Sequence, residues 1–131
     1  MSVNPRIDTI GAWIAAGVRQ TIPMSELSTV FPEIYQKVAR AVLAADGHLR
    51  GPAYGCYFGM PTDTVDVEIG FGIDRELELP GITVTAWPEA QAVVGTHIGP
   101  YEDLARSYEE LGAWMSAQDV PLADYMWEFY D

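Results

Sequence analysis

The sequence predicts an α+β fold of two tandem β-α-β-β repeats related by a pseudo-twofold axis, with antiparallel sheets backed by two long helices. Two segments, 27–45 and 104–115, carry apolar residues at helical spacing. Short alternating stretches, rich in aromatic and β-branched residues, surround each of these segments. The order of elements in residues 7–74 is repeated in residues 82–131. We therefore expect a single domain, 1–131, with a ligand cleft between its repeats.

The size and composition of the chain suit one compact domain. It has 131 residues, of which 49% are apolar, which is enough for a hydrophobic core. No apolar run approaches the ~20 residues that cross a membrane, and the N-terminus lacks a signal-peptide pattern. The single cysteine, Cys56, excludes an intrachain disulfide. We interpret it as a small buried hydrophobic residue in a cytoplasmic protein.

The charge of the chain limits its partners. The net charge is −12, and the seven Lys and Arg residues are scattered along the sequence. Without a basic patch to neutralise phosphates, direct nucleic-acid binding is not expected. The excess of carboxylates favours solubility and also concentrates cations near an acidic cleft. No cysteine stands at ligand spacing from His48 or His97, so we predict no metal site and no cofactor.

The first repeat begins with an alternating stretch and a helix. Residues 7–20 predict a strand that is bulged or broken at its two glycines. The helix that follows has Ser25 as its predicted N-cap and Gly47 as its C-terminal stop. Because Pro32 falls within the apolar stripe, we expect the main helix to restart there.

Two strands complete the first repeat. Residues 53–58 are aromatic and predict one strand, and residues 65–73 alternate strictly and predict the other. Asp66 and Glu68 fall on the non-core face of the second strand. We interpret both as solvated charges in preference to ligands.

The second repeat has the same parts. Strands are predicted at 82–87 and 91–98, and Gly99-Pro100 opens a helix that ends at Val120-Pro121. The helix has a predicted core face of Leu104, Tyr108, Leu111 and Met115.

The final strand, 124–130, is unusual because Glu128 stands in the middle of an aromatic run. Side chains alternate along a strand, so Met126, Glu128 and Tyr130 share one face. A charge is costly to bury unless something pairs with it, and we interpret the missing partner as a ligand. The repeat alignment matches Glu128 with Gly55, and Tyr130 with Tyr57. Glu128 would then be the one charge in an otherwise twofold cleft.

Three motifs in this order carry a family resemblance. They are the turn His97-Ile98-Gly99-Pro100-Tyr101, the helix from Tyr108 through Leu111 to Trp114, and the strand Trp127-Glu128-Phe129-Tyr130. Together they resemble the GyrI-like domains, also called transcription-activator effector-binding domains, over nearly the whole chain. The resemblance implies a duplicated fold in which Glu128 pairs with lipophilic, aromatic cations held between aromatic side chains.

Two departures from the family pattern matter. Family members usually continue from this strand into a final edge strand, whereas this sequence stops at Asp131. An unpaired edge there would permit a homodimer. Many relatives also carry a DNA-binding domain, for which this sequence has no room, so direct control of transcription is not expected.

The resemblance and the repeat together give a set of candidate residues. Glu128 is expected to supply the charge, and the aromatic walls of the cleft are expected to come from Tyr57, Tyr130, Tyr108 and Trp87. His97 is either a ligand-binding residue or a hydrogen-bonded structural residue of its turn. The remaining strand aromatics are expected to face the helices as core: Tyr54, Phe58, Trp127 and Phe129.

Three functions fit these expectations. The first is a stand-alone domain that captures lipophilic, aromatic and cationic compounds, such as drugs or toxins. The second is a hydrolase of reactive, cyclopropane-type compounds in which Glu128 and a tyrosine activate water. The third is an acidic module that binds a basic protein such as a topoisomerase.

Overall fold

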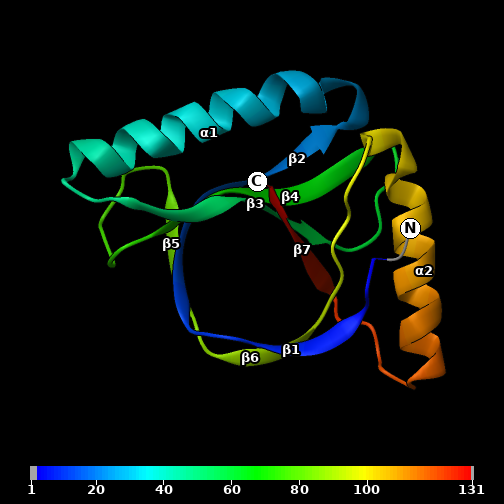
Figure 1. Ribbon diagram of the computed structural model, residues 1–131. Coiled ribbons are helices and arrows are strands. Elements are labelled where there is room, and N and C mark those ends of the chain that lie inside the picture. The colour runs from blue at the N-terminus through cyan, green and yellow to red at the C-terminus, as the bar shows by residue number, and fades with distance from the viewer. Residues whose placement is uncertain (1–2, 131) are drawn as a thin grey trace. The chain divides into compact units, whose positions relative to one another are not determined.

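The computed structural model describes residues 3–130, and the chain divides into two compact units (Figure 1). The first, which we call the sheet unit, contains residues 12–88 and 124–130. The second, which we call the α2 unit, contains residues 3–11 and 89–123. Antiparallel sheets and two long helices confirm the predicted α+β class.

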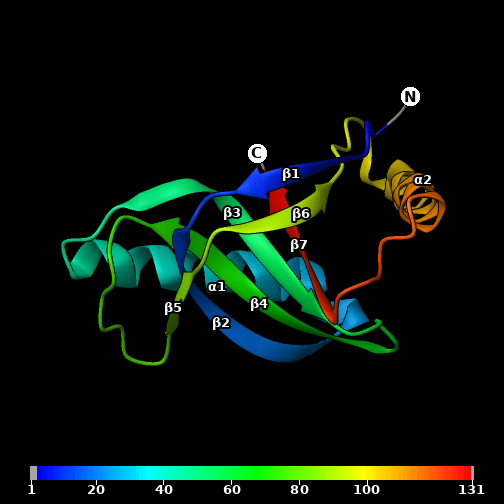
Figure 2. The same ribbon diagram turned by 90° about the horizontal axis from the view of Figure 1, so that it is seen from below.

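The sheet unit is built on five antiparallel strands in the order β5-β2-β4-β3-β7 (Figures 1 and 2). The central strand, β4, is the alternating segment that the sequence predicts, and it is buried along most of its length. The strand at one end of this order, β7, pairs with β3. The strands are β2 (Trp13–Pro23), β3 (Leu49–Phe58), β4 (Thr64–Ile73), β5 (Thr83–Trp87) and β7 (Tyr125–Tyr130).

The helix α1 (Leu27–Ala44) covers one face of this sheet (Figure 1). Its apolar stripe places Ile34, Val38 and Val42 against the sheet, where they are buried. The alternating apolar residues of β4 pack against these three side chains, because every second side chain of a strand points to the same face. We call this side of the sheet the α1 face.

The start of α1 differs from the prediction. A single 3-10 turn, η1 (Met24–Glu26), contains Ser25, and Glu26 occupies the N-cap position without a side-chain cap. The prediction of Ser25 as N-cap was therefore wrong, because the N-cap lies one residue later, at Glu26. Pro32 lies inside a continuous helix, so the predicted restart was also wrong. Because α1 starts at Leu27, Pro32 falls in its second turn.

The end of α1 also differs, because an aspartate takes the left-handed position expected for a glycine. Asp46 has a φ of 60°, and its N–H donates to the carbonyl of Leu43. The Gly47 N–H donates to Val42, which completes a Schellman motif. The position of Gly47 is crowded: an added Cβ would lie 2.5 Å from the end of the Leu77 side chain and 3.2 Å from the Val42 carbonyl oxygen. The stop is thus at the predicted place, but Asp46 makes the turn.

The α2 unit pairs β1 (Arg6–Ile10) with β6 (Ala90–Val94) in a two-stranded antiparallel sheet. The predicted strand over residues 7–20 is broken after Ile10, at the first of its two glycines, while the second glycine lies within β2. A 3-10 turn, η2 (Tyr101–Asp103), leads into the helix α2 (Leu104–Ala117).

The segment at the start of the described chain is held to the α2 unit by two hydrogen bonds. The Val3 N–H donates to the Glu110 carboxylate at 3.0 Å, and the Val3 carbonyl accepts from Thr96 at 2.8 Å. Val3 itself is buried. The helix α2 ends as α1 does, with an aspartate, Asp119, in the left-handed region.

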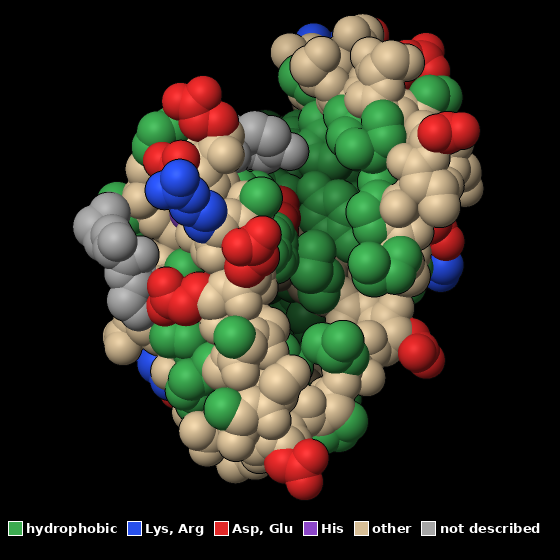
Figure 3. Space-filling model, turned by 90° about the vertical axis from the view of Figure 1, so that its right-hand side faces the viewer, with side chains coloured by type: hydrophobic (Ala, Val, Ile, Leu, Met, Phe, Trp, Pro, Cys, Tyr) green, Lys and Arg blue, Asp and Glu red, His purple; other side chains and the backbone are tan. Residues whose placement is uncertain are grey.

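Among the charged side chains of the protein, acidic ones are the more numerous. On the face drawn in Figure 3, Asp and Glu are spread out and outnumber Lys and Arg, in keeping with 19 acidic and seven basic residues in the chain. Among the residues that the structure describes, no helix is both long and apolar enough to span a membrane.

Candidate functional site

The register of β3 and β7 places Glu128 directly opposite Gly55. These are the two residues that the repeat alignment matches, and they are the only matched pair that also pairs across the strands. If a twofold axis exchanged β3 with β7, it would pass between two residues that are aligned in the repeat and also paired across the strands. The repeat symmetry itself stays a prediction, and the observation is that Gly55 and Glu128 lie opposite each other.

The same register brings Tyr57 and Tyr130 together on one face. Alternation puts both on the side of Gly55 and Glu128, and Tyr57 packs against the core beneath α1. Their hydroxyl oxygens are 2.8 Å apart, and the Tyr130 hydroxyl donates to Glu128 Oε1 at 2.7 Å. Three of the candidate residues thus form one hydrogen-bonded chain on the α1 face.

Gly55 leaves room for this chain of hydroxyls. A Cβ at Gly55 would lie 3.2 Å from the Tyr130 oxygen and 3.2 Å from Cε2 of Tyr57, closer than most side chains allow. Glycine in a strand often marks such a close approach. Gly55 is therefore a structural part of the site, a role for which the sequence gives only the repeat alignment as a signal.

Tyr35 of α1 belongs to the same site. Its hydroxyl donates to the backbone carbonyl of Tyr54 at 2.9 Å, which ties the helix to β3. Its ring meets Phe31 and Phe71 edge-on, with centroids 6.1 Å and 5.3 Å away. Sequence reasoning missed Tyr35 because it lies beside the apolar stripe of α1 and belongs to no motif.

The surroundings of the site raise the pKa values of two of its tyrosines. Tyr130 is 37% exposed as a residue. Partial burial, and then the hydrogen bonds to Tyr57 and Glu128, raise the pKa of Tyr130 above its usual range. Burial likewise raises the pKa of Tyr35, with smaller contributions from Tyr57 and Glu128. Both phenols therefore stay protonated at neutral pH, beside a half-buried carboxylate.

The opposite side of the sheet carries a second aromatic group, which we call the aromatic face. The expectation that these rings lie under the helices was wrong for α1, because alternation turns them to the side away from it. Trp87 lies here too: its ring is 5.0 Å from that of Trp127 and perpendicular to it. The indole N–H groups of these two tryptophans find no acceptor within the described part of the chain. The aromatic face comprises Trp13, Tyr54, Phe58, Trp87, Tyr125, Trp127 and Phe129.

Glu68 lies buried on the aromatic face, so its prediction as a solvated charge was wrong. It is 7% exposed, and the fully buried Tyr54 hydroxyl donates to its Oε2 at 2.7 Å. The pair covers Gly17, where an added Cβ would overlap the Tyr54 hydroxyl. Its partner lies 14 positions away on the neighbouring strand, which no local pattern reveals. Asp66, by contrast, lies at the surface, where it forms a bidentate pair with Arg19 at 3.0 Å and 2.8 Å.

His97 and Tyr108 lie in the α2 unit. One imidazole nitrogen of His97 is 2.6 Å from the Ser107 hydroxyl, and the other is 3.0 Å from the Pro100 carbonyl. Both ring nitrogens are thus engaged by the turn and by the first turns of α2. Tyr108 is half-buried on α2. The structure therefore assembles Tyr57, Glu128 and Tyr130, and it places Trp87 on the aromatic face.

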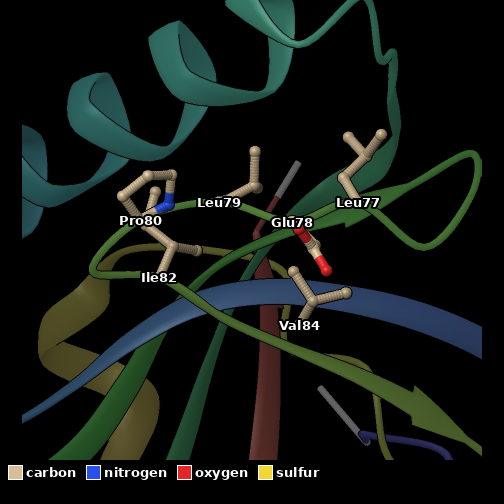
Figure 4. A pocket seen from close by; sticks show the side chains of 6 residues that line it. All are labelled: Leu77, Glu78, Leu79, Pro80, Ile82 and Val84. Carbon is tan, nitrogen blue, oxygen red and sulfur yellow. The ribbon is translucent and has the colours of Figure 1, made fainter.

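A shallow surface depression of about 480 Å³ lies elsewhere in the sheet unit (Figure 4). It is formed by the segment before β5 and by the start of that strand, and Glu78 is its one charged residue. Its other lining residues are Leu77, Leu79, Pro80, Ile82 and Val84. Within residues 3–130, no three His, Cys, Asp or Glu side chains gather in a way that could hold a metal ion.

A half-buried carboxylate among tyrosines combines a negative charge with aromatic rings, both of which attract cations. The model of the GyrI-like small molecule binding domain matches residues 3–131. The chain therefore belongs to the GyrI-like family of small-molecule-binding domains. This confirms the resemblance seen in the sequence motifs.

Solved structures agree with this fold. The C-terminal domain of EcmrR is 24% identical, with a TM-score of 0.81 over 98% of this chain and 84% of that one. EcmrR in its complex with DNA is 25% identical, with a TM-score of 0.78 over 97% of this chain. This chain spans only 49% of that longer EcmrR chain. No curated protein sequence matches the chain.

Proposed function

We propose that this domain captures lipophilic, aromatic cations, in which Glu128 supplies the counter-charge and Tyr35, Tyr57 and Tyr130 supply the aromatic surroundings. The observation that carries the proposal is the hydrogen-bonded chain from Tyr57 through Tyr130 to Glu128. It holds a half-buried carboxylate in one orientation on a face rich in aromatic rings. Drugs and toxins with a delocalised positive charge are the natural class of ligand.

Two attractions would hold a cation at this site: the charge of the carboxylate and the faces of the aromatic rings. A carboxylate that has lost part of its water is attracted more strongly to a cation than an exposed one, because the local dielectric constant is lower. The faces of tyrosine and phenylalanine rings add a cation–π attraction of roughly 0.5–2 kcal/mol. The net charge of −12 further raises the local concentration of cations. We place this function in the cytoplasm, where the free thiol of Cys56 would stay reduced.

The test is a titration of a cationic acridine dye, followed by fluorescence anisotropy, with the variant Glu128→Gln. Glutamine keeps the shape of the side chain and removes its charge. We expect the affinity to fall about tenfold, because one charge-assisted contact is lost.

The matched control is Glu76→Gln, an exposed carboxylate of the sheet unit, which changes the net charge by the same amount. It should bind the dye as the parent does. Equal dye affinity in Glu128→Gln and the parent would contradict the proposal. An equal loss in both variants would show that only the overall charge matters.

A second candidate function is hydrolysis of reactive, cyclopropane-type compounds at the same site. The specific observation in its favour is the 2.7 Å hydrogen bond between Tyr130 and Glu128, since such a pair can orient a water molecule and accept its proton. Mass spectrometry of a cyclopropane-bearing probe after long incubation separates the two functions. Opened product that is lost in Glu128→Ala favours hydrolysis, whereas intact probe favours capture.

A further inference from the structure

His97 and Ser107 form a hydrogen-bonded pair inside the α2 unit. The Nδ1 atom of His97 is 2.6 Å from the Ser107 hydroxyl oxygen, and both residues are half-buried. His97 precedes the turn that leads into α2, and Ser107 lies in the first turn of that helix. A histidine within hydrogen-bond reach of a hydroxyl, itself oriented by a third group, is the geometry of an activated nucleophile.

The third group is the backbone carbonyl of Pro100, which fixes the nitrogen of His97 that carries the proton. A carbonyl oxygen only accepts, so its 3.0 Å contact with Nε2 requires a proton on that nitrogen. In the neutral imidazole, Nδ1 then has a lone pair, and Ser107 donates its hydroxyl proton to it. The imidazole is therefore oriented as a base toward Ser107.

Backbone hydrogen bonds hold the base and its orienting group in place. The Asp103 N–H donates to the same Pro100 oxygen at 3.1 Å, in the 3-10 turn before α2. On the other side of His97, the Thr96 N–H donates to the Val3 carbonyl at 2.8 Å. The pair is thus positioned by the fold on both sides, as a reactive site requires.

We propose that Ser107 is a nucleophile that accepts an acyl group from activated, uncharged esters, with His97 as its general base. The Ser107 oxygen attacks the ester carbonyl carbon while its proton moves to His97 Nδ1. The bond from that carbon to the leaving oxygen then breaks, and the leaving oxygen takes the proton from Nδ1. The products are acyl-Ser107 and a free alcohol or phenol, with neutral His97 restored. The proposal is independent of the cation site, because Glu128 belongs to the sheet unit.

The surroundings limit the class of ester. A backbone carbonyl orients the imidazole but brings no full negative charge to stabilise the imidazolium, so we expect reaction only with good leaving groups such as phenols. Carboxylates are frequent beside Ser107 in the sequence, and they disfavour the approach of anionic esters. They are Glu102, Asp103, Glu109 and Glu110.

The test is the reaction of the full chain with 4-nitrophenyl acetate. The parent should release about one equivalent of 4-nitrophenolate in a burst, and peptide mass spectrometry should find the acetyl group on Ser107. In His97→Gln we expect the acetylation rate of Ser107 to fall about a hundredfold, because the general base is lost. In the parent this rate should also fall at acid pH, because the imidazolium has no lone pair on Nδ1.

The matched control is Ser116→Ala, which removes an exposed serine of the same helix and should leave the burst unchanged. Ser107→Ala should abolish the burst, and Ser107→Cys should restore acetylation at this position. Near-ultraviolet circular dichroism checks that each variant is folded.

Three results would overturn the proposal. They are a burst that persists in Ser107→Ala, acetylation of Ser107 no faster than that of Ser116 in the parent, and an unchanged rate at Ser107 in folded His97→Gln. The hydrogen bond between His97 and Ser107 would then only fasten the turn to α2.

Discussion

Cys56 lies at the centre of the aromatic face and is fully buried. Loss of water, and then the nearby Glu68 carboxylate, raise the pKa of its thiol to about 12 from an ordinary 9.0. A thiolate is the reactive form, so burial and the raised pKa both protect this cysteine. The sequence-based interpretation of Cys56 as a small buried hydrophobic residue is confirmed.

This burial predicts a pH-dependent reaction with a disulfide reagent such as DTNB. At pH 8 the folded protein should react at least a hundredfold more slowly than the protein unfolded in guanidinium chloride. Because the folded-state pKa is raised, the thiol contributes stability that is present below pH 9 and is lost as the pH rises toward 12. Rapid labelling of the folded protein at pH 8 would contradict the described burial.

Other single residues show where sequence reasoning succeeds and where it fails. Glu128 is conspicuous because strand alternation and its aromatic neighbours are both local signals. Tyr35 and Gly55 act through contacts with residues that are distant in sequence. Glu68 was misassigned for the same reason, since its position in the alternating pattern suits a solvated charge equally well.

At the scale of elements, two glycines let β2 and β4 approach closely. Gly17 and Gly70 face each other across the two strands, and a Cβ at Gly70 would overlap the carbonyl oxygen of Ala16. The same gap makes room for the Tyr54 hydroxyl and for Glu68 above Gly17. The glycines in the alternating pattern of β4 are therefore sites of close backbone contact.

The variant Gly70→Ala tests this close contact. We expect it to lower the free energy of unfolding by about 1–3 kcal/mol, because β2 must move away or β4 must bend. The control is Gly112→Ala in α2, where an added Cβ meets nothing within 4 Å and where alanine should stabilise the helix by about 0.5–1 kcal/mol. Urea unfolding measures both, and a Gly70→Ala variant as stable as the parent would rule out the close contact.

Element boundaries were harder to predict than the elements themselves. The central strand and both helices lie where their apolar periodicities place them. The ends of the helices depend on hydrogen bonds that periodicity does not encode. Both helices end at an aspartate in the left-handed region, Asp46 and Asp119, although glycine is the usual signal for such a turn.

At the scale of the whole molecule, the predicted fold class and family are confirmed, while the predicted cleft remains a prediction. The order of elements and the sequence motifs were enough to indicate a GyrI-like domain. The two compact units do not follow the two sequence repeats, because β5 and β7 join the sheet of the first repeat while β1 pairs with β6. This exchange is what places Glu128 beside Gly55 and Tyr57, and only the register of β3 with β7 reveals it.

The most direct test of the proposed function is a crystal structure of the chain with a brominated cationic acridine dye. Anomalous scattering from the bromine locates the dye without ambiguity. We predict that the dye lies on the α1 face, with its charged nitrogen within about 6 Å of the Glu128 carboxylate. Its rings should lie against Tyr57 or Tyr130. A dye bound only to the aromatic face, against Trp87 or Trp127, would contradict the account.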